Sequence, residues 1–216
     1  MINNNLLKRL LSSLILIPLA LFFTIKGSFL FNFFISICFF ISAYEWFMMS
    51  KNRYYNFFGL IFLIFSFYSI YQLRNNFNDD YIYLLLIALI CVSTDVGGYI
   101  FGNLIKGPKI TKISPNKTYS GMIGSYLLSI LSVNLFFYFS YTFTETMYKF
   151  LIFTLIVSTF SQLGDLTISY FKRLSKIKDT GKIIPGHGGI LDRIDGMIFA
   201  FPLSFLILKT NFFQYF

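Results

Sequence analysis

The sequence predicts an all-α fold, a polytopic membrane bundle of about seven transmembrane helices. Hydrophobic side chains make up 56% of the 216 residues and charged ones only 12%, a composition too apolar for a soluble domain of this size. The apolar residues also gather in runs that reach or approach the roughly 20 residues needed to cross a bilayer. We therefore predict one integral membrane domain over residues 1–216, with N-terminal membrane helices in 1–80.

Each apolar run is predicted to form one helix. The first run follows Lys8 and Arg9 as in a signal peptide, but no small-residue cleavage site follows it, so we expect an uncleaved helix. Cys38 and Cys91 fall inside runs and are expected to pack as small apolar side chains. In chain order the predicted helices cover residues 10–25, 28–47, 56–73, 81–100, 121–141, 149–164 and 196–208.

The basic residues predict the orientation, because cytoplasmic loops of membrane proteins carry an excess of Lys and Arg. With the N-terminus inside, only Lys26, Arg74, Lys149 and Lys209 fall outside. The loops 101–120 and 165–195 are then cytoplasmic. The inside segments hold Lys8, Arg9, Lys51, Arg53, Lys106, Lys109, Lys112, Lys117, Lys172, Arg173, Lys176, Lys178, Lys182 and Arg193.

The stretch 164–179 continues the sixth run into polar sequence without a proline, so it is predicted to be helical. Asp165, Ser169, Lys172 and Lys176 then recur four, three and four positions apart and share one face. A carboxylate followed by a hydroxyl and cations suits a metal ion with phosphate oxygens beside it. A solvated helix face with ion pairs between successive turns is the alternative.

The glycines of the next stretch, 180–195, favour an anion-binding loop. Gly186, Gly188 and Gly189 let the backbone approach a ligand closely and turn its N–H groups toward an anion. His187 has no second His or Cys nearby, so we expect it to contact phosphate or to pack the loop rather than to bind zinc.

Two carboxylates follow this loop at the predicted start of the last helix. Asp192 and Asp195 are three positions apart and can share a face, with Arg193 projecting to one side. Hard oxygen ligands of this kind suit Mg²⁺, which takes substrate phosphates as further ligands.

A third polar stretch covers residues 95–121. Asp95 lies at the end of an apolar run, where an ionisable residue is a functional candidate, and it is followed by glycines. Ser114, Lys117 and Thr118 are predicted to lie in a short turn that can contact phosphate oxygens. A Gly/Pro loop that only joins two spans is the alternative. The glycines are Gly97, Gly98 and Gly102.

Together these stretches resemble the phosphatidate cytidylyltransferases. The resemblance covers roughly residues 90–200, which we predict to be the catalytic core. Its longest part is Ser169-x-x-Lys172-Arg173-x₄-Lys178-Asp179, followed by Pro185-Gly-His-Gly-Gly189-x-x-Asp192-Arg193-x-Asp195. Shorter parts are Ser114-Pro115-x-Lys117-Thr118, Gly164-Asp165-Leu166, and Asp95 with Tyr99 and Gly102.

The resemblance implies a site made by these motifs. Asp165 and Asp192 would bind Mg²⁺, with Asp195 and Asp95 as further candidate ligands, and a monovalent cation such as K⁺ would share the site. The catalytic set would be Asp165, Lys172, Arg173, Asp192 and Arg193. The phosphate-binding set would be Ser114, Lys117, Thr118, Ser169, Lys172, Arg173, Lys178, His187, Gly188, Gly189 and Arg193.

The resemblance also implies the reaction and its setting. CMP would pass from CTP to phosphatidate at the cytoplasmic face of a bacterial-type inner membrane, giving CDP-diacylglycerol and pyrophosphate. A homodimer in the lipid bilayer is expected, and no nucleic-acid partner.

Three positions depart from the family pattern. Ile168 and Ser120 stand where many members carry Glu, and Gly196 replaces a common Ser. Two other functions stay open. One is another CTP-using lipid enzyme, such as a polyprenol kinase or an archaeal-type lipid cytidylyltransferase. The other is a carrier or channel with an anion site, which is disfavoured because the charges gather at one face and no internal repeat is visible.

Overall fold

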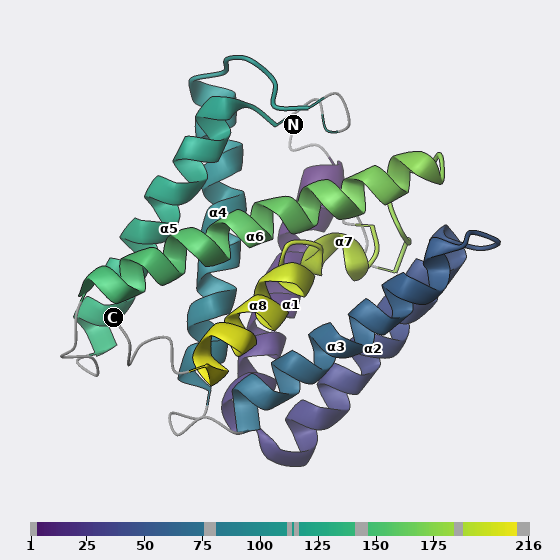
Figure 1. The fold of residues 1–216 in the computed structure, drawn as a ribbon, viewed down its shortest axis with the longest axis horizontal. Helices are drawn as coiled ribbons and strands as arrows, with labels where there is room; N and C mark the ends of the chain where they lie inside the picture. The colour runs from purple at the N-terminus through teal and green to yellow at the C-terminus, as the bar shows by residue number, and fades with distance from the viewer. Residues whose placement is uncertain are drawn as a thin grey trace. The chain divides into compact units, whose positions relative to one another are not determined.

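The computed structural model describes residues 4–75, 81–111, 114, 117–140, 147–183 and 188–210, with side chains from Leu14 onward. Each apolar run predicted to be helical, as far as it is described, lies in one helix except for at most one residue at an end. No strand occurs within these residues, so the all-α prediction is confirmed. The helices are α1 (Asn4–Lys26), α2 (Ser28–Met49), α3 (Tyr55–Asn75), α4 (Ile82–Leu104), α5 (Tyr119–Ser140), α6 (Met147–Leu174), α7 (Leu191–Ile194) and α8 (Met197–Lys209) (Figure 1).

Five helices in the described part of the chain, α2 to α6, are long and apolar enough to cross a membrane. The apolar part of α1, Leu14–Lys26, and α8 are shorter. The predicted set of about seven spans thus divides into five full-length candidates and two short apolar helices. Large apolar side chains are exposed along these helices, among them Leu14, Phe29, Phe58 and Tyr138, as expected for surfaces that face lipid tails.

The chain forms two compact units. The first unit holds residues 1–81 and 171–195, and the second holds residues 82–170 and 196–216. α6 contributes to both, because the boundary falls between Tyr170 and Phe171. The predicted ranges 1–80 and 90–200, and the single domain over 1–216, stay predictions.

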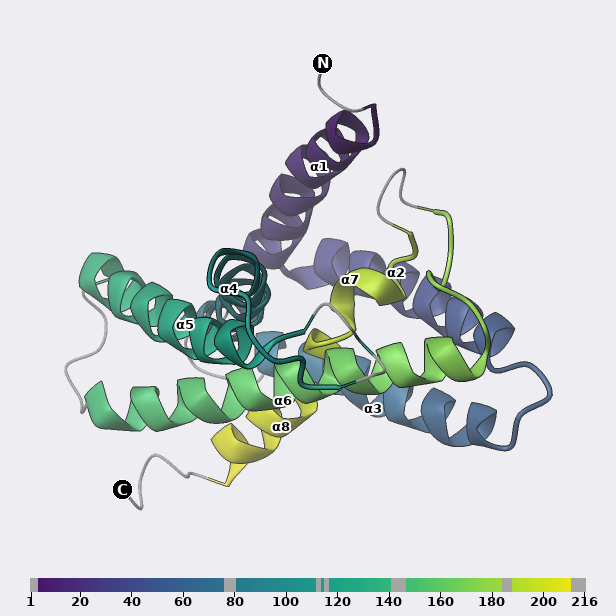
Figure 2. The same cartoon turned by 90° about the horizontal axis from the view of Figure 1, so that it is seen from above.

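In the first unit, α2 and α3 pack side by side (Figure 2). The Phe39 and Phe67 rings meet edge to face with centroids 5.4 Å apart. The Trp46 ring lies over Gly59, where any Cβ would collide with it, and its Nε1 donates to the Asn56 carbonyl at 3.0 Å. These contacts fix the end of α2 that carries Glu45.

In the second unit, α4 and α5 pack closely through glycines (Figure 2). A Cβ on Gly97 would lie 2.5 Å from the Gly124 carbonyl oxygen, and one on Gly121 would lie 2.8 Å from the Gly98 carbonyl oxygen. The predicted span 81–100 already contained Asp95, Gly97 and Gly98, and α4 continues past it to Leu104, so that Gly102 is helical as well. Its glycines therefore belong to a helix–helix contact, where small residues let backbones approach.

α6 ends earlier than the sequence suggested. The helix stops at Leu174, so the predicted continuation to residue 179 is wrong and Lys176 is not on the helical face. Ile177 N–H donates to the Lys172 carbonyl and Lys176 N–H to the Arg173 carbonyl, both at 3.0 Å, and Lys176 has φ +58°. This is a Schellman ending, which usually uses Gly at the left-handed position. Because Lys occupies that position, the sequence carried no stop signal.

Candidate active site

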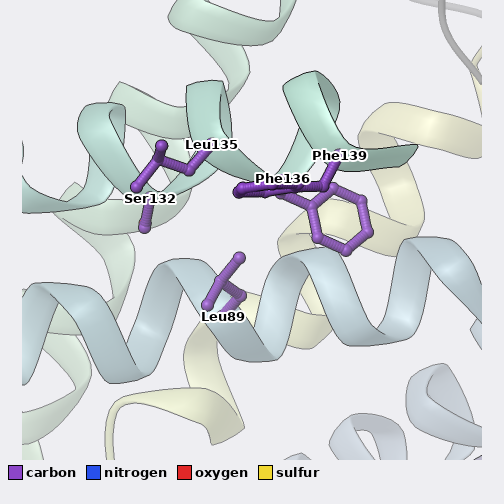
Figure 3. A pocket seen from close by; sticks show the side chains of 5 residues that line it. All are labelled: Leu89, Ser132, Leu135, Phe136 and Phe139. Carbon is purple, nitrogen blue, oxygen red and sulfur yellow. The ribbon is translucent and has the colours of Figure 1, made fainter. Parts of the chain in front are cut away.

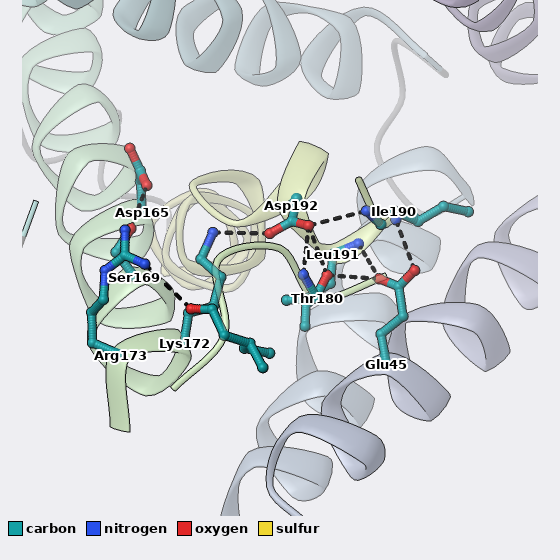
Figure 4. A network of polar contacts seen from close by, with 11 residues as sticks. Glu45, Asp165, Ser169, Lys172, Arg173, Thr180, Ile190, Leu191 and Asp192 are labelled. Carbon is teal, nitrogen blue, oxygen red and sulfur yellow. Dashed lines mark hydrogen bonds and ion pairs between the residues drawn. The ribbon is translucent and has the colours of Figure 1, made fainter. Parts of the chain in front are cut away.

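The Asp192 carboxylate is the centre of a polar network in the first unit (Figure 4). Oδ1 accepts from Lys172 Nζ at 2.9 Å. Oδ2 accepts from the Thr180 N–H at 2.7 Å, the Gly189 N–H at 3.0 Å and the Thr180 hydroxyl at 3.0 Å. A carboxylate offers about four lone-pair positions, so these donors engage most of its capacity.

The surroundings of Asp192 act on its pKa in opposite directions. Burial raises the pKa, but the hydrogen bond from Lys172, the Gly189 N–H, the charge of Lys172 and the Thr180 N–H lower it, and the net pKa lies below the usual value of an aspartate. Asp192 therefore stays ionised at neutral pH, and its side chain is only 3% exposed.

Glu45 joins this network, although it is not among the predicted site residues. Its Oε1 accepts from the Ile190 N–H at 3.1 Å and its Oε2 from the Leu191 N–H at 2.8 Å. Thr180 Oγ1 lies 3.1 Å from the same Oε2. A lone acid at the end of an apolar run was a signal that could have identified Glu45, whereas nothing in the sequence pointed to Thr180.

Gly188 and Gly189, the described members of the three glycines predicted to bind an anion, lie against these carboxylates. Gly188 has φ +85°, a conformation that favours glycine, and a Cβ there would lie 2.7 Å from Asp192 Oδ2. A Cβ on Gly189 would collide with Glu45 and Thr180. The Gly189 N–H points to a carboxylate of the protein itself, so a role in binding an anion stays a prediction. His187 and Gly186 lie outside the described residues.

A second cluster surrounds Asp165 in the second unit. Lys117 Nζ lies 2.5 Å from Asp165 Oδ2, and the Ser169 hydroxyl donates to Oδ1 at 3.2 Å. The side chains of Lys117 and Asp165 are 24% and 27% exposed, so both remain accessible to a ligand. The structure thus brings Lys117, which was selected in a different stretch, to Asp165 and Ser169, which were predicted to share a helix face.

The backbone around Ser114 and Thr118 holds Lys117 in place. Lys117 N–H donates to the Ser114 carbonyl at 3.1 Å, which closes the predicted turn, and Ile110 N–H donates to the Lys117 carbonyl at 2.9 Å. The Thr118 hydroxyl accepts from the Gly121 N–H at 3.1 Å, so Thr118 is the N-cap of α5. Phosphate binding by Ser114 and Thr118 stays a prediction.

The remaining predicted site residues differ in their exposure and contacts. Arg173 is exposed and donates to the Ile177 carbonyl at 3.2 Å. Lys178 and Arg193 are exposed, and Asp195 is buried within the first unit. Asp95 is exposed on α4. Within the described residues, no three His, Cys, Asp or Glu side chains gather as a metal-binding group.

The two carboxylates predicted to bind Mg²⁺ differ in how well they fit a metal. Asp165 is a hard oxygen donor that is partly exposed, with Ser169 beside it, and Mg²⁺ is commonly held by one or two carboxylates plus substrate phosphates. Asp192 is more buried, and most of its acceptor positions are already occupied by donors of the protein. A metal ion there requires Lys172 to leave Oδ1, so Asp165 fits the better of the two.

The departures from the family pattern have structural counterparts. Ile168 is buried, with 4% of its surface exposed. The Ser120 hydroxyl donates to the Lys106 carbonyl and ties the loop to the start of α5. A Cβ on Gly196 would lie 2.5 Å from the Ser161 hydroxyl and 2.9 Å from its carbonyl oxygen, so glycine lets α6 approach the start of α8.

An apolar cavity of about 380 Å³ lies between α4 and α5 (Figure 3). Its lining is Leu89, Ser132, Leu135, Phe136 and Phe139. No charged side chain lines it, so it does not supply the groups that bind phosphate or a metal ion.

Similarity to known proteins agrees with the motifs. Residues 57–211 match the model of the Cytidylyltransferase family. A protein named phosphatidate cytidylyltransferase from Staphylococcus saprophyticus is 38% identical over 182 residues, which cover 81% of this chain and 67% of that protein. Proteins of the same name from Staphylococcus haemolyticus and Staphylococcus aureus are 39% and 38% identical over the same shares. The family match and these identities, taken with the motif residues gathered around Asp165 and Asp192, establish that the chain belongs to the cytidylyltransferase family.

Proposed function

We propose that the chain is a phosphatidate cytidylyltransferase, which transfers CMP from CTP to phosphatidate. The observation that carries this proposal is that each of the two carboxylates predicted to bind Mg²⁺ pairs with a motif lysine, Asp165 with Lys117 and Asp192 with Lys172. Lysine ammonium groups can offset the negative charge of substrate phosphates, and carboxylates can bind a metal cation. The relatives bearing that enzyme name support the choice of substrates.

In this reaction a phosphate oxygen of phosphatidate attacks the α-phosphorus of CTP. One P–O bond forms, the bond from the α-phosphorus to the oxygen bridging to the β-phosphorus breaks, and pyrophosphate leaves with that oxygen. Both reactants are polyanions, so the main task of the protein is to offset their charge and align them. Lys117, Lys172, Arg173 and Arg193 are the proposed phosphate-binding cations.

The two lysine–carboxylate pairs suggest how substrate and cation would enter the site. In the structure, carboxylates hold the ammonium groups of Lys117 and Lys172 in fixed positions. Neither side chain therefore has to be ordered from solvent when substrate binds. Substrate phosphates compete for these ammonium groups, and each carboxylate is then left with an open oxygen for a cation. Ser169 keeps the Asp165 carboxylate oriented, and Thr180 and Gly189 do so for Asp192.

Mg²⁺ is the proposed cofactor, held by Asp165 and, once Lys172 has left, by Asp192. When bound, it supplies positive charge that offsets charge on the phosphate oxygens in the transition state. Asp195 and Asp95 remain further candidate ligands, and a second cation such as K⁺ is part of the same proposal.

The setting is also proposed. The family and the apolar helices support an enzyme embedded in the bilayer, and the excess of Lys and Arg in the loops supports an N-terminus and active site on the cytoplasmic side. We place the protein in a bacterial inner membrane as a homodimer. The acyl chains of phosphatidate then stay in lipid while its head group meets CTP.

The experiment uses the purified protein in lipid nanodiscs with CTP labelled at either the α- or the γ-phosphate. We expect α-label to enter a CDP-lipid when phosphatidate and Mg²⁺ are present. Transfer of γ-label to a polyprenol would identify a kinase instead. Intact CTP under conditions where a Staphylococcus relative is active would refute the proposal. Uptake of unchanged CTP by sealed proteoliposomes that contain the protein would support a carrier.

A further inference from the structure

We propose that Glu45 is a positioning residue that holds the segment around Thr180 and the start of α7, and thereby orients the Asp192 carboxylate. The inference rests on the proposed function, because it assigns Asp192 to the reaction. Glu45 lies on α2, far in sequence from the motifs, and all of the residues involved belong to the first unit.

The first support is how Glu45 contacts the start of α7. The N–H groups of Ile190 and Leu191 donate to its two carboxylate oxygens at 3.1 and 2.8 Å. The first N–H groups of a helix have no acceptor within the helix, and the N-cap residue Ile190 has no side chain able to accept them. A side chain from α2 therefore supplies the cap that the local sequence lacks.

The second support is the link through Thr180. Its hydroxyl oxygen lies 3.1 Å from Glu45 Oε2 and 3.0 Å from Asp192 Oδ2, and its N–H donates to the same Asp192 oxygen at 2.7 Å. A hydroxyl has one hydrogen to donate, so the two carboxylates share it. A displacement of Glu45 is thus transmitted to Asp192 by one intervening residue.

The third support is the space kept for the Glu45 carboxylate. Glu45 is 2% exposed, and a Cβ on Gly181 would lie 2.5 Å from its Oε1. A Cβ on Gly189 would collide with Oε2. Glycine at both positions therefore lets the backbone approach the Glu45 carboxylate closely, which is a role apart from binding an anion.

A buried carboxylate is costly unless its partners compensate it. In the described part of the chain, its partners are the three donors named above, and no ion pair with a lysine or arginine occurs. An apolar side chain would fill the same space at lower cost. The geometry therefore indicates that Glu45 serves as a charged hydrogen-bond acceptor in a fixed position, and not merely as a side chain that fills space.

The test compares Glu45→Gln, Thr180→Val and Thr180→Ser in nanodiscs, with Thr210→Val as a matched hydroxyl deletion at the end of α8, outside the site. We expect Glu45→Gln and Thr180→Val to lower kcat by about 10- to 100-fold, the scale of a small misplacement of a reacting group. KM for CTP should change much less. Thr180→Ser, which keeps the hydroxyl, should recover most of kcat, and the double variant Glu45→Gln/Thr180→Val should be less than additive.

A second measurement does not depend on turnover. Lys182 is exposed in the same segment, so trypsin cleavage there should be faster in Glu45→Gln than in the unaltered protein. Unaltered kcat and cleavage in both variants would overturn the role of Glu45, as would a loss confined to the amount of folded protein with normal kcat in what remains. Absence of CMP transfer in the unaltered protein would instead refute the proposed function, and the cleavage result would still decide whether Glu45 holds the segment.

Discussion

The ammonium group of Lys172 lies 2.9 Å from Oδ1 of Asp192, and their side chains are 12% and 3% exposed. Asp165 has an equivalent lysine, Lys117, at 2.5 Å in the second unit. Both carboxylates proposed to bind a metal ion are therefore occupied by a cation of the protein. Any metal ion or substrate phosphate that enters has to compete with one of these pairs.

Replacing Asp192 with asparagine should abolish most activity. In one orientation of the asparagine amide, its NH₂ group faces Lys172; in the other, it faces the donors that now bind Oδ2. In both orientations the remaining carbonyl oxygen is a weaker acceptor than the carboxylate. We expect CMP transfer to fall by about 100-fold or more, as removal of a principal electrostatic group can do. Asp80→Asn is the control, because it removes a carboxylate from a loop predicted to lie on the other side of the membrane. Near-normal CMP transfer at saturating Mg²⁺ would contradict a catalytic role for Asp192.

The same substitution should also lower stability, since breaking a buried ion pair typically costs about 3–5 kcal/mol. This exceeds the roughly 1 kcal/mol expected if Asp192 only capped a helix. Thermal unfolding in nanodiscs separates the two accounts.

Removing Lys117 should make Asp165 more available to a cation. We expect Lys117→Met to strengthen binding of Mn²⁺, used as a spectroscopic substitute for Mg²⁺, by about fivefold in the absence of substrate, because a partly exposed ion pair contributes up to about 1 kcal/mol. KM for CTP should rise, since a phosphate-binding cation is lost. Electron paramagnetic resonance measures the free Mn²⁺. Unchanged Mn²⁺ affinity would show that Lys117 and the cation do not compete.

Stability should depend on pH through Asp192. Its pKa is lower in the folded protein than the value of about 3.9 for a free side chain. The ionised group therefore contributes stability that is fully present above about pH 5 and is lost as the pH falls through the folded-state pKa. In metal-free buffer, the difference in unfolding temperature between the unaltered protein and Asp192→Asn should be largest near neutral pH and shrink below about pH 4. A difference that grows on acidification would contradict the direction of the shift.

The glycine contact between α4 and α5 should be sensitive to a single methyl group. Gly97→Ala places a Cβ 2.5 Å from the Gly124 carbonyl oxygen, and backbone cannot move aside as a side chain can. We expect a loss of about 1–3 kcal/mol, typical of overpacking. Gly102→Ala is the comparison, because its Cβ meets the Thr118 hydroxyl at 3.3 Å. Equal unfolding temperatures for the two variants would argue against close helix packing at Gly97.

The predicted orientation can be tested with single cysteines at Lys112 and Lys182 in a chain whose own Cys38 and Cys91 have been replaced. Both positions should resist an impermeant thiol reagent in intact cells and react after permeabilisation, because both loops are predicted to be cytoplasmic. A cysteine at Asp80 should show the opposite pattern. Labelling of Lys182→Cys in intact cells would place the site away from cellular CTP.

The sequence by itself determined the class of fold and the position of each long helix. Runs of apolar residues must form helices in lipid, because every backbone N–H and C=O has to be satisfied within the segment. The motif residues Asp165, Lys172 and Asp192 were also visible, because unusual polar residues stand out in an apolar chain. Both kinds of signal are local, because they depend only on composition and on spacing along the chain.

Only the tertiary structure decided which of these residues meet. The pairing of Lys117 with Asp165 and the contact of Glu45 with the start of α7 join segments that are distant in sequence, and no local pattern encodes such contacts. The end of α6 was also missed, because Lys176 takes a left-handed conformation that residue type does not announce. For the stretch that holds the glycines of α4, the sequence left open a functional role or a loop that only joins two spans. Only the packing of α5 against these glycines shows a close helix contact.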